Sequence, residues 1–227
     1  MKPLRVVCAT RLSRENFLSQ TQTGRSIQSF ITSSKVEVRL YADNSKGLSQ
    51  VYNQAIEESQ ESPAILVFMH DDILITDYFY ETRIRQGLEQ FDIIGLAGNR
   101  RRIPGQVGWR TLNLAGDLDL DENLSGAIGH GPSFPPQFFK TFGPTEVECK
   151  LMDGLLLAAD SQTLKKVGLK FDERFSFHFY DLDFCRQAEI KHLKMGTIPL
   201  SVVHLSGGNM DQVWRNTYDE YLKKWGE

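Results

Sequence analysis

The feature that most constrains this chain is the regular alternation of short apolar runs with amphipathic segments along about its first hundred residues. The clearest run, Ala64 to Met69, is uninterrupted and is bounded by charged residues. Such a run is typical of a central parallel strand, because that strand is covered on both faces. We expect further strands at Arg5–Ala9, Glu37–Tyr41 and Ile93–Ala97.

The segments between these runs have the periodicity of helices. In one of them apolar residues return at i, i+3, i+4, i+7 and i+8, at Leu48, Val51, Tyr52, Ala55 and Ile56. We expect another helix to open at Ser13 and end near Ile31, and a third around Tyr80, Ile84 and Leu88. The alternation predicts an α/β fold with a single Rossmann-like mixed sheet that carries helices on both faces. Ligands of such a sheet bind at the carboxyl ends of its strands.

The second half of the chain is less regular. Glycine and proline are dense from Asn99 to Lys150, where we expect loops and irregular strands. The elements expected after it are a strand at Leu155–Ala159, a short helix between Asp160 and Gly168, a helix at Tyr180–Leu193 and a strand at Ile198–Val203. The last segment carries an aromatic stripe at helical spacing, which we interpret as a docking face. The stripe consists of Met210, Trp214, Thr217, Tyr218, Tyr221 and Trp225.

Composition excludes several classes of partner. Lys and Arg total 26 against 29 Asp and Glu, and a net charge of −3 is not the electrostatic footprint of a nucleic-acid-binding protein. No stretch approaches the ~20 apolar residues of a transmembrane segment. The cysteines, Cys8, Cys149 and Cys185, lie far apart and are expected to be reduced thiols. These features predict a cytoplasmic protein, either free or peripheral to the inner face of the membrane.

The strongest local signal for chemistry is His70-Asp71-Asp72, at the carboxyl end of the run Ala64–Met69. Adjacent carboxylates repel each other, and a divalent cation together with phosphate oxygens offsets that repulsion. The alternative is a solvated loop that caps the next helix. His204 also ends an expected strand and could complete a shell of nitrogen and oxygen ligands for Mn or Mg, although a single histidine is more often a bystander.

Two further places carry candidate residues. Asp43-Asn44 closes the second strand, and its carboxylate could accept a hydrogen bond from the imide N–H of uracil, with Thr10 beside it at the end of the first strand. The alternative is an ordinary turn and helix entry. Asp181 and Asp183 lie in the first turn of a helix and point to different sides. One could serve as general base while the other binds Arg186 or the chain, and the alternative for each is a helix cap.

Taken in order, these residues resemble the family 2 inverting glycosyltransferases of the GT-A fold, especially the short bacterial glycosyltransferase-like proteins. The resemblance covers nearly the whole chain and depends on the order and spacing of its motifs. The motifs are Asn44-Ser45-Lys46-Gly47-Leu48, Asn53-Gln54-Ala55-Ile56, Phe68-Met69-His70-Asp71-Asp72, Asp153-Gly154-Leu155-Leu156, Phe171-Asp172-Glu173-Arg174-Phe175, Tyr180-Asp181-Leu182-Asp183-Phe184-Cys185-Arg186 and Val203-His204.

The resemblance implies a role for each matching residue. Asp72 corresponds to the last carboxylate of the family's Asp-x-Asp metal motif, and His204 to a late histidine that reaches the metal. Asp181 corresponds to the catalytic base. Thr10 and Asp43 match positions that hold the nucleobase, and Asp71 becomes a supporting acid. Asn44 and Asp153 complete the expected cofactor-binding residues, and the Asp153-Gly154 turn is expected to shape the acceptor site. The sequence departs from the family at His70, which replaces the first Asp of the metal motif, and at Tyr180, which replaces the Glu before the base.

The implied activity is transfer of one sugar from a nucleotide diphosphate sugar, expected to be UDP-linked, to an acceptor hydroxyl with inversion. The cofactor would be Mn or Mg, and the acceptor a glycan, a lipid-linked molecule or a small molecule. One domain is expected, with residues 1–98 as its nucleotide-binding half and 99–227 as its acceptor-binding and catalytic half. A catalytically inactive module that binds a nucleotide sugar or a glycan is the alternative. A sugar-phosphate nucleotidyltransferase would need a glycine-rich basic loop, which Ala9-Thr10-Arg11-Leu12 does not provide.

Overall fold

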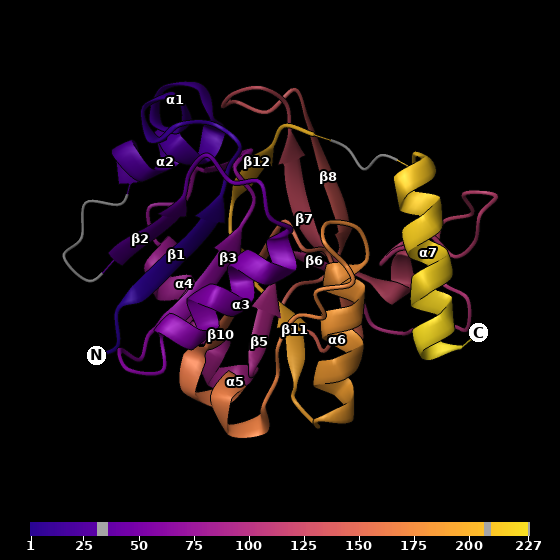
Figure 1. The fold of residues 1–227 in the computed structure, drawn as a ribbon. Helices are drawn as coiled ribbons and strands as arrows, with labels where there is room; N and C mark the ends of the chain where they lie inside the picture. Colours follow the sequence, from indigo (N-terminus) through magenta and orange to yellow (C-terminus); the bar gives the residue numbers. More distant parts are fainter. Residues whose placement is uncertain (31–35, 207–209, 227) are drawn as a thin grey trace.

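The computed structural model describes residues 1–30, 36–206 and 210–226. Within these residues the strands form two sheets, and helices lie around both of them (Figure 1). The prediction of an α/β fold is confirmed. The prediction of a single sheet is wrong, because strands from both halves of the chain form a second sheet.

The first sheet has the strand order β11-β5-β10-β3-β1-β2. Its strands are β1 (Leu4–Ala9), β2 (Val36–Tyr41), β3 (Ile65–Met69), β5 (Ile93–Gly95), β10 (Leu156–Asp160) and β11 (Met195–Thr197). β1 lies between β2 and β3 and is parallel to both, with Val6 opposite Val38 and Val67. β10 enters between β3 and β5 and runs antiparallel to each, so the sheet is mixed. The carboxyl ends of β1, β2 and β3 therefore lie together at one edge, as the sequence predicts.

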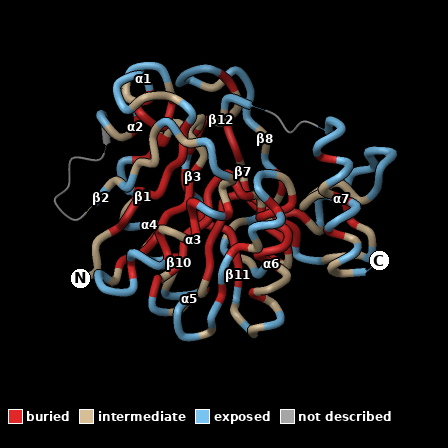
Figure 2. Tube along the Cα trace, in the orientation of Figure 1, coloured by how far each residue is buried: buried red, intermediate tan, exposed pale blue. Residues whose placement is uncertain are grey.

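Alternating side chains of these strands enter two different cores. Val7 and Phe68 belong to a cluster packed under α3 (Leu48–Glu58), α5 (Ser161–Val167) and α6 (Tyr180–Ile190). Val6 and Val67 enter a second cluster that includes α4 (Tyr80–Gln90) and parts of the second sheet. Figure 2 shows the buried residues concentrated along the central strands and the inner sides of the helices. Helices thus cover both faces of the first sheet, as predicted.

The second sheet has the order β4-β12-β7-β6-β9, and β8 pairs with β7. Its strands are β4 (Ile73–Ile75), β6 (Ala97–Asn99), β7 (Leu124–His130), β8 (Phe138–Gly143), β9 (Leu151–Met152) and β12 (Val202–His204). The expected strand at Ile93–Ala97 is divided between the sheets, because the chain passes from β5 to β6 at Leu96. The expected strand at Ile198–Val203 begins after β11, and only its last two residues, Val202 and Val203, belong to a strand, β12. The segment 99–150 also contains the β7–β8 pair and the short helix η1 (Asp121–Asn123), so it is more regular than its composition suggests.

The expected helix from Ser13 is interrupted. Ser13 caps α1 (Arg14–Gln20) as predicted, by accepting a hydrogen bond from the Asn16 N–H. Thr21 then adopts an extended conformation, and its side chain accepts from the Gly24 N–H, which starts α2 (Gln22–Phe30). The predicted end near Ile31 lies outside the described residues.

The aromatic stripe of the last segment docks as predicted. α7 (Gln212–Trp225) is capped by Asp211, and it buries Trp214, Tyr218 and Tyr221 against the rest of the protein. The Phe179 ring contacts all three of these aromatic rings. Among the described residues, no helix combines the length and the apolar character that crossing a membrane requires.

Candidate active site

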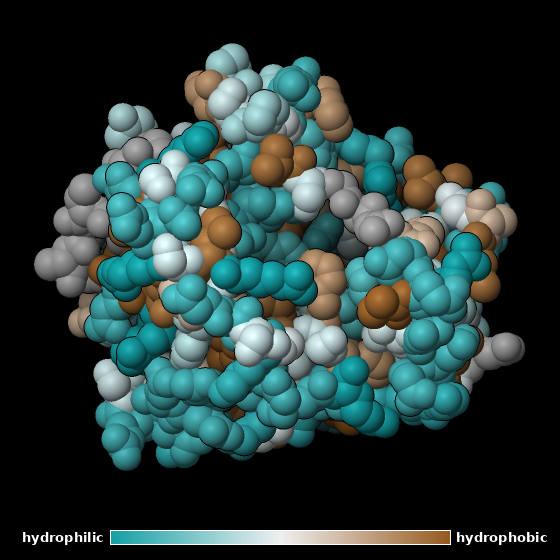
Figure 3. Space-filling model, turned by 45° about the horizontal axis from the view of Figure 1, so that its top comes forward, coloured by the Kyte–Doolittle hydropathy of each residue, from teal (hydrophilic) through white to brown (hydrophobic). Residues whose placement is uncertain are grey.

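A cavity of about 580 Å³ opens at the carboxyl ends of β1, β2 and β3. Thr10 follows β1, Asn44 follows β2 by a short turn, and His70, Asp71 and Asp72 follow β3, and all five residues line this cavity. Figure 3 shows a hollow with largely hydrophilic walls near the middle of the face that comes forward in that view. The predicted edge of the sheet therefore carries a cavity that polar and charged side chains help to line.

Thr10 and Asp71 link the carboxyl ends of β1 and β3. The Thr10 hydroxyl donates a hydrogen bond of 2.7 Å to Oδ2 of Asp71, which joins the end of β1 to the end of β3. The Thr10 carbonyl accepts from the Asn44 N–H at 2.9 Å, and this bond holds the turn after β2 beside β1. Asp43 adopts a left-handed conformation with φ of 51° in that turn. Its side chain is exposed and is not among the described residues that line the cavity.

His70, Asp72 and His204 form a cluster that could hold a metal ion. One ligand atom from each residue lies within 4.8 Å of those of the others. The two parts of the cluster meet because β4 begins directly after Asp72 and pairs with β12, which places His204 opposite Ile73. Asp72 and His204 were both predicted as metal ligands. His70, which replaces the first Asp of the family motif, is the third member.

One oxygen of the Asp72 carboxylate accepts a hydrogen bond, and the other accepts none from the described residues. Its Oδ2 accepts from the Ser206 hydroxyl at 2.5 Å and lies 3.4 Å from Nε2 of His204. Its Oδ1 is buried and has no hydrogen-bond partner among the described residues. Burial raises the pKa of Asp72, but the hydrogen bonds from His204 and Ser206 outweigh burial and hold this pKa well below its usual range. Asp72 is therefore an anion whose unpaired oxygen is available to a cation.

Asp153 and Asp181 lie on either side of the turn at Gly154. Oδ2 of Asp153 accepts from the Trp109 indole N–H at 2.8 Å, and Oδ2 of Asp181 accepts from the Gly154 N–H at 2.9 Å. Burial, together with the charge of Asp153, raises the pKa of Asp181 to about 7. Neither carboxylate is among the described residues that line the 580 Å³ cavity. Asp153 is nevertheless close enough for its charge to act on both His70 and His204.

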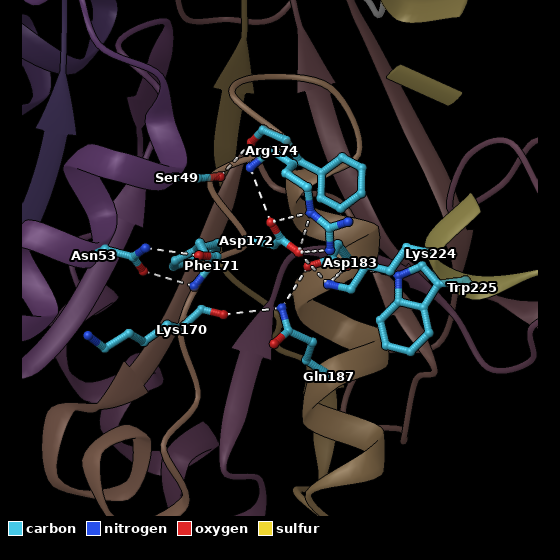
Figure 4. A network of polar contacts seen from close by, with 11 residues as sticks. Ser49, Asn53, Lys170, Phe171, Asp172, Arg174, Asp183, Gln187, Lys224 and Trp225 are labelled. Atoms are coloured by element: carbon cyan, nitrogen blue, oxygen red, sulfur yellow. Dashed lines mark hydrogen bonds and ion pairs between the residues drawn. The ribbon is translucent and has the colours of Figure 1, made fainter. Parts of the chain in front are cut away.

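Asp183 has a structural role that separates it from Asp181. Its carboxylate is fully buried and accepts from Lys224 at 2.5 Å, from the Trp225 indole at 2.8 Å and from Gln187 at 2.6 Å. Lys224 also contacts Asp172, so the end of α7 is fastened to α6 and to the loop before it (Figure 4). The sequence left open which of the two aspartates binds the chain, and these contacts identify Asp183, with Lys224 rather than Arg186 as its cation.

The Phe177 and His130 rings also lie near the cluster of His70, Asp72 and His204, and neither was predicted as a site residue. The Phe177 ring stacks on His70 with 6.1 Å between centroids. His130, at the end of β7, lies 6.1 Å from the His204 ring and stacks on Phe138 at 4.8 Å. No local signal marks His130, because it reaches the site only through the parallel pairing of β7 with β12.

No family model matches the sequence, and no curated protein matches it either. Among solved structures, GalNAc-T7, crystallised with UDP, GalNAc and Mn²⁺, superposes with a TM-score of 0.57 over 97% of this chain and at 11% identity. The chain has the GT-A fold. It spans about half the length of GalNAc-T7, since the match covers 48% of that chain.

Two further solved structures resemble this GT-A chain more weakly. A197 from STIV has a TM-score of 0.49 and 11% identity, over 91% of this chain and 87% of A197. The catalytic domain of Drosophila β1,4-galactosyltransferase 7, in complex with xylobiose, has a TM-score of 0.46 and 11% identity, over 87% of this chain and 65% of that one. The GT-A fold confirms the predicted fold class, whereas membership of family 2 and a bacterial origin stay predictions.

Proposed function

We propose that this chain is a metal-dependent glycosyltransferase that moves one sugar from a nucleotide diphosphate sugar to an acceptor hydroxyl. The observation that carries the proposal is the buried Oδ1 of Asp72, which has no hydrogen-bond partner among the described residues and belongs to a cluster with His70 and His204 at a cavity beside the strand carboxyl ends. A GT-A sheet binds its ligands at that edge. The cavity volume of about 580 Å³ falls within the range of small-molecule sites.

The residues of the cluster fit a divalent cation. His70 and His204 would supply imidazole nitrogens and Asp72 a carboxylate oxygen. Phosphate oxygens of the donor are the kind of ligand that would complete such a set. Mg²⁺ takes oxygen ligands almost exclusively, so two imidazoles favour Mn²⁺ over Mg²⁺ in this site. When bound, the cation supplies positive charge that stabilises the negative charge developing on the departing diphosphate.

The donor is proposed to lie along the ends of β1 and β2. Thr10 and Asn44 line this part of the cavity, and Asp43 lies in the same turn, where the proposal places a uracil base. Arg11 and Lys46 also line the cavity and are the positively charged side chains that a diphosphate group requires nearby. The nucleotide-binding part of the proposal is thus supported by residues 1–98, and residues 99–227 are proposed to hold the acceptor.

Asp181 is our proposed general base. A pKa of about 7 suits a carboxylate that must accept a proton near neutral pH, and an in-line attack assisted by this base would give inversion. Asp181 does not line the 580 Å³ cavity, and this observation favours a second candidate function, which is nucleotide-sugar binding without transfer.

The two functions are separated by measuring the turnover of UDP-sugars with added Mn²⁺ in the wild type, Asp72→Ala and Asp181→Asn. We expect loss of donor binding and turnover in Asp72→Ala, and retained donor binding with slow turnover in Asp181→Asn. Equal turnover in all three proteins would overturn the proposal. Donor binding that needs Mn²⁺ and Asp72, with no turnover in the wild type on any acceptor tested, would identify a binding module.

A further inference from the structure

We propose that Tyr180 is a positioning residue that forces His70 to carry its proton on Nε2 and to offer Nδ1 to the metal. The inference rests on the proposed function in one respect, which is that His70 serves as a metal ligand. It also explains why position 180 is a tyrosine, where the family that the sequence resembles has a glutamate before the base.

The assignment follows from counting the protons of one hydroxyl group. The Tyr180 hydroxyl lies 2.7 Å from the Gly154 carbonyl oxygen and 2.8 Å from Nε2 of His70. A carbonyl oxygen can only accept, so the single hydroxyl proton is donated to Gly154. The hydroxyl oxygen must then accept from His70, and Nε2 must carry the proton.

The proton on Nε2 decides which atom of His70 can bind a metal. With the proton on Nε2, the only lone pair on the ring is at Nδ1, and a metal can bind His70 only through that atom. A histidine ligand that donates its other N–H to a fixed partner is the usual arrangement around protein-bound metals.

The Tyr180 hydroxyl cannot easily move away from these partners. The Tyr180 ring is buried, with the Tyr52 and Phe171 rings each 5.9 Å from it between centroids. Gly154 is held from the same helical turn, because Asp181 accepts from its N–H while Tyr180 donates to its C=O. The first turn of α6 therefore connects a metal ligand to the turn beside the proposed base.

The first test compares two tyrosine variants. Tyr180→Phe removes the acceptor of the His70 proton, and we expect the Kd for Mn²⁺ to rise by about 10- to 100-fold, the usual effect of losing such a partner. The matched control is Tyr218→Phe, because Tyr218 is also buried and also donates to a glycine carbonyl, that of Gly105, at 2.7 Å. The control should keep the wild-type Kd, as measured by titration calorimetry without nucleotide sugar.

The second test reads the proton position directly. Long-range ¹H–¹⁵N NMR of the metal-free protein at pH 8 distinguishes the two imidazole tautomers, and His70→Gln assigns the signals. We expect the Nε2–H tautomer for His70 in the wild type and in Tyr218→Phe, and loss of this pattern in Tyr180→Phe. A proton on Nδ1 in the wild type would overturn the inference, as would equal Mn²⁺ affinity in the two tyrosine variants.

A third variant, Gly154→Ala, tests the contact between Tyr180 and His70 without changing either residue. A Cβ added at Gly154 would lie 2.2 Å from the Tyr180 hydroxyl oxygen, so Gly154→Ala must displace that hydroxyl and weaken Mn²⁺ binding. A Cβ at Gly108 meets Thr111 at an ordinary 3.5 Å, so Gly108→Ala should bind Mn²⁺ normally. If the wild type bound no Mn²⁺ at all, the metal-dependent function would fail, and the NMR measurement would still decide the role of Tyr180.

Discussion

At the scale of single residues, Asp181 carries the sharpest expectation for pH dependence. Its folded-state pKa of about 7 lies above the ordinary value of 3.8, so the carboxyl is protonated in acid and ionised above neutrality. A general base must be ionised, and we expect kcat/KM to rise with pH and reach a plateau above about pH 7. Asp181→Asn should remove this limb and lower the rate by about 10²- to 10⁴-fold.

The same pKa predicts the sign of a stability effect. Because folding raises the pKa of Asp181, this residue contributes stability that is fully present below pH 3.8 and is lost as the pH rises through about 7. Urea denaturation at pH 5 and pH 8 measures the difference, and it should be smaller in Asp181→Asn. An acidic limb of kcat/KM that persists unchanged in this variant would show that another group is the base.

At the scale of elements, a buried ion pair between Asp183 and Lys224 contributes to the attachment of α7. Asp183 is fully buried and Lys224 largely so, which means that Lys224→Met leaves a buried carboxylate without its cation. Breaking a buried pair in this way costs about 3 kcal/mol in the free energy of unfolding. We expect this loss in urea denaturation, together with faster amide exchange along α7.

The neighbouring lysine provides a matched control for that experiment. Lys223 pairs with Glu220 on the same helix, but its side chain is 70% exposed, and exposed pairs of this kind contribute little. Lys223→Met should therefore change the free energy of unfolding by less than about 1 kcal/mol. Equal losses in the two variants would mean that the attachment of α7 does not depend on Asp183.

At the scale of the whole molecule, a bound donor should stabilise the entire fold by mass action. At roughly a hundredfold excess over Kd, a ligand that binds only the folded state raises the melting temperature by about 5 to 10 °C for a chain of this size. We expect this shift for UDP with Mn²⁺ and a smaller one with Mg²⁺, measured by thermal unfolding. A shift of the same size in Asp72→Ala would exclude the metal cluster as the binding site.

The sequence alone determined most elements and the edge at which the site lies. Apolar periodicity reports whether a segment is buried on one face or two, and this is a local property that the run Ala64–Met69 and the stripe of α3 display without tertiary information. Because the carboxyl ends of parallel strands meet, the proximity of Thr10, Asn44 and Asp71 also followed from the alternation of strands and helices.

Only the tertiary structure decided how the second half of the chain completes the site. The pairing of β12 with β4 and β7 brings His204 and His130 to the cluster, and the packing of α6 brings Tyr180 to His70. These strands lie far apart along the chain, and their pairing depends on how apolar side chains from the whole molecule pack together. No local pattern records that choice, which is why His130, the role of Tyr180 and the second sheet could not be read from the sequence.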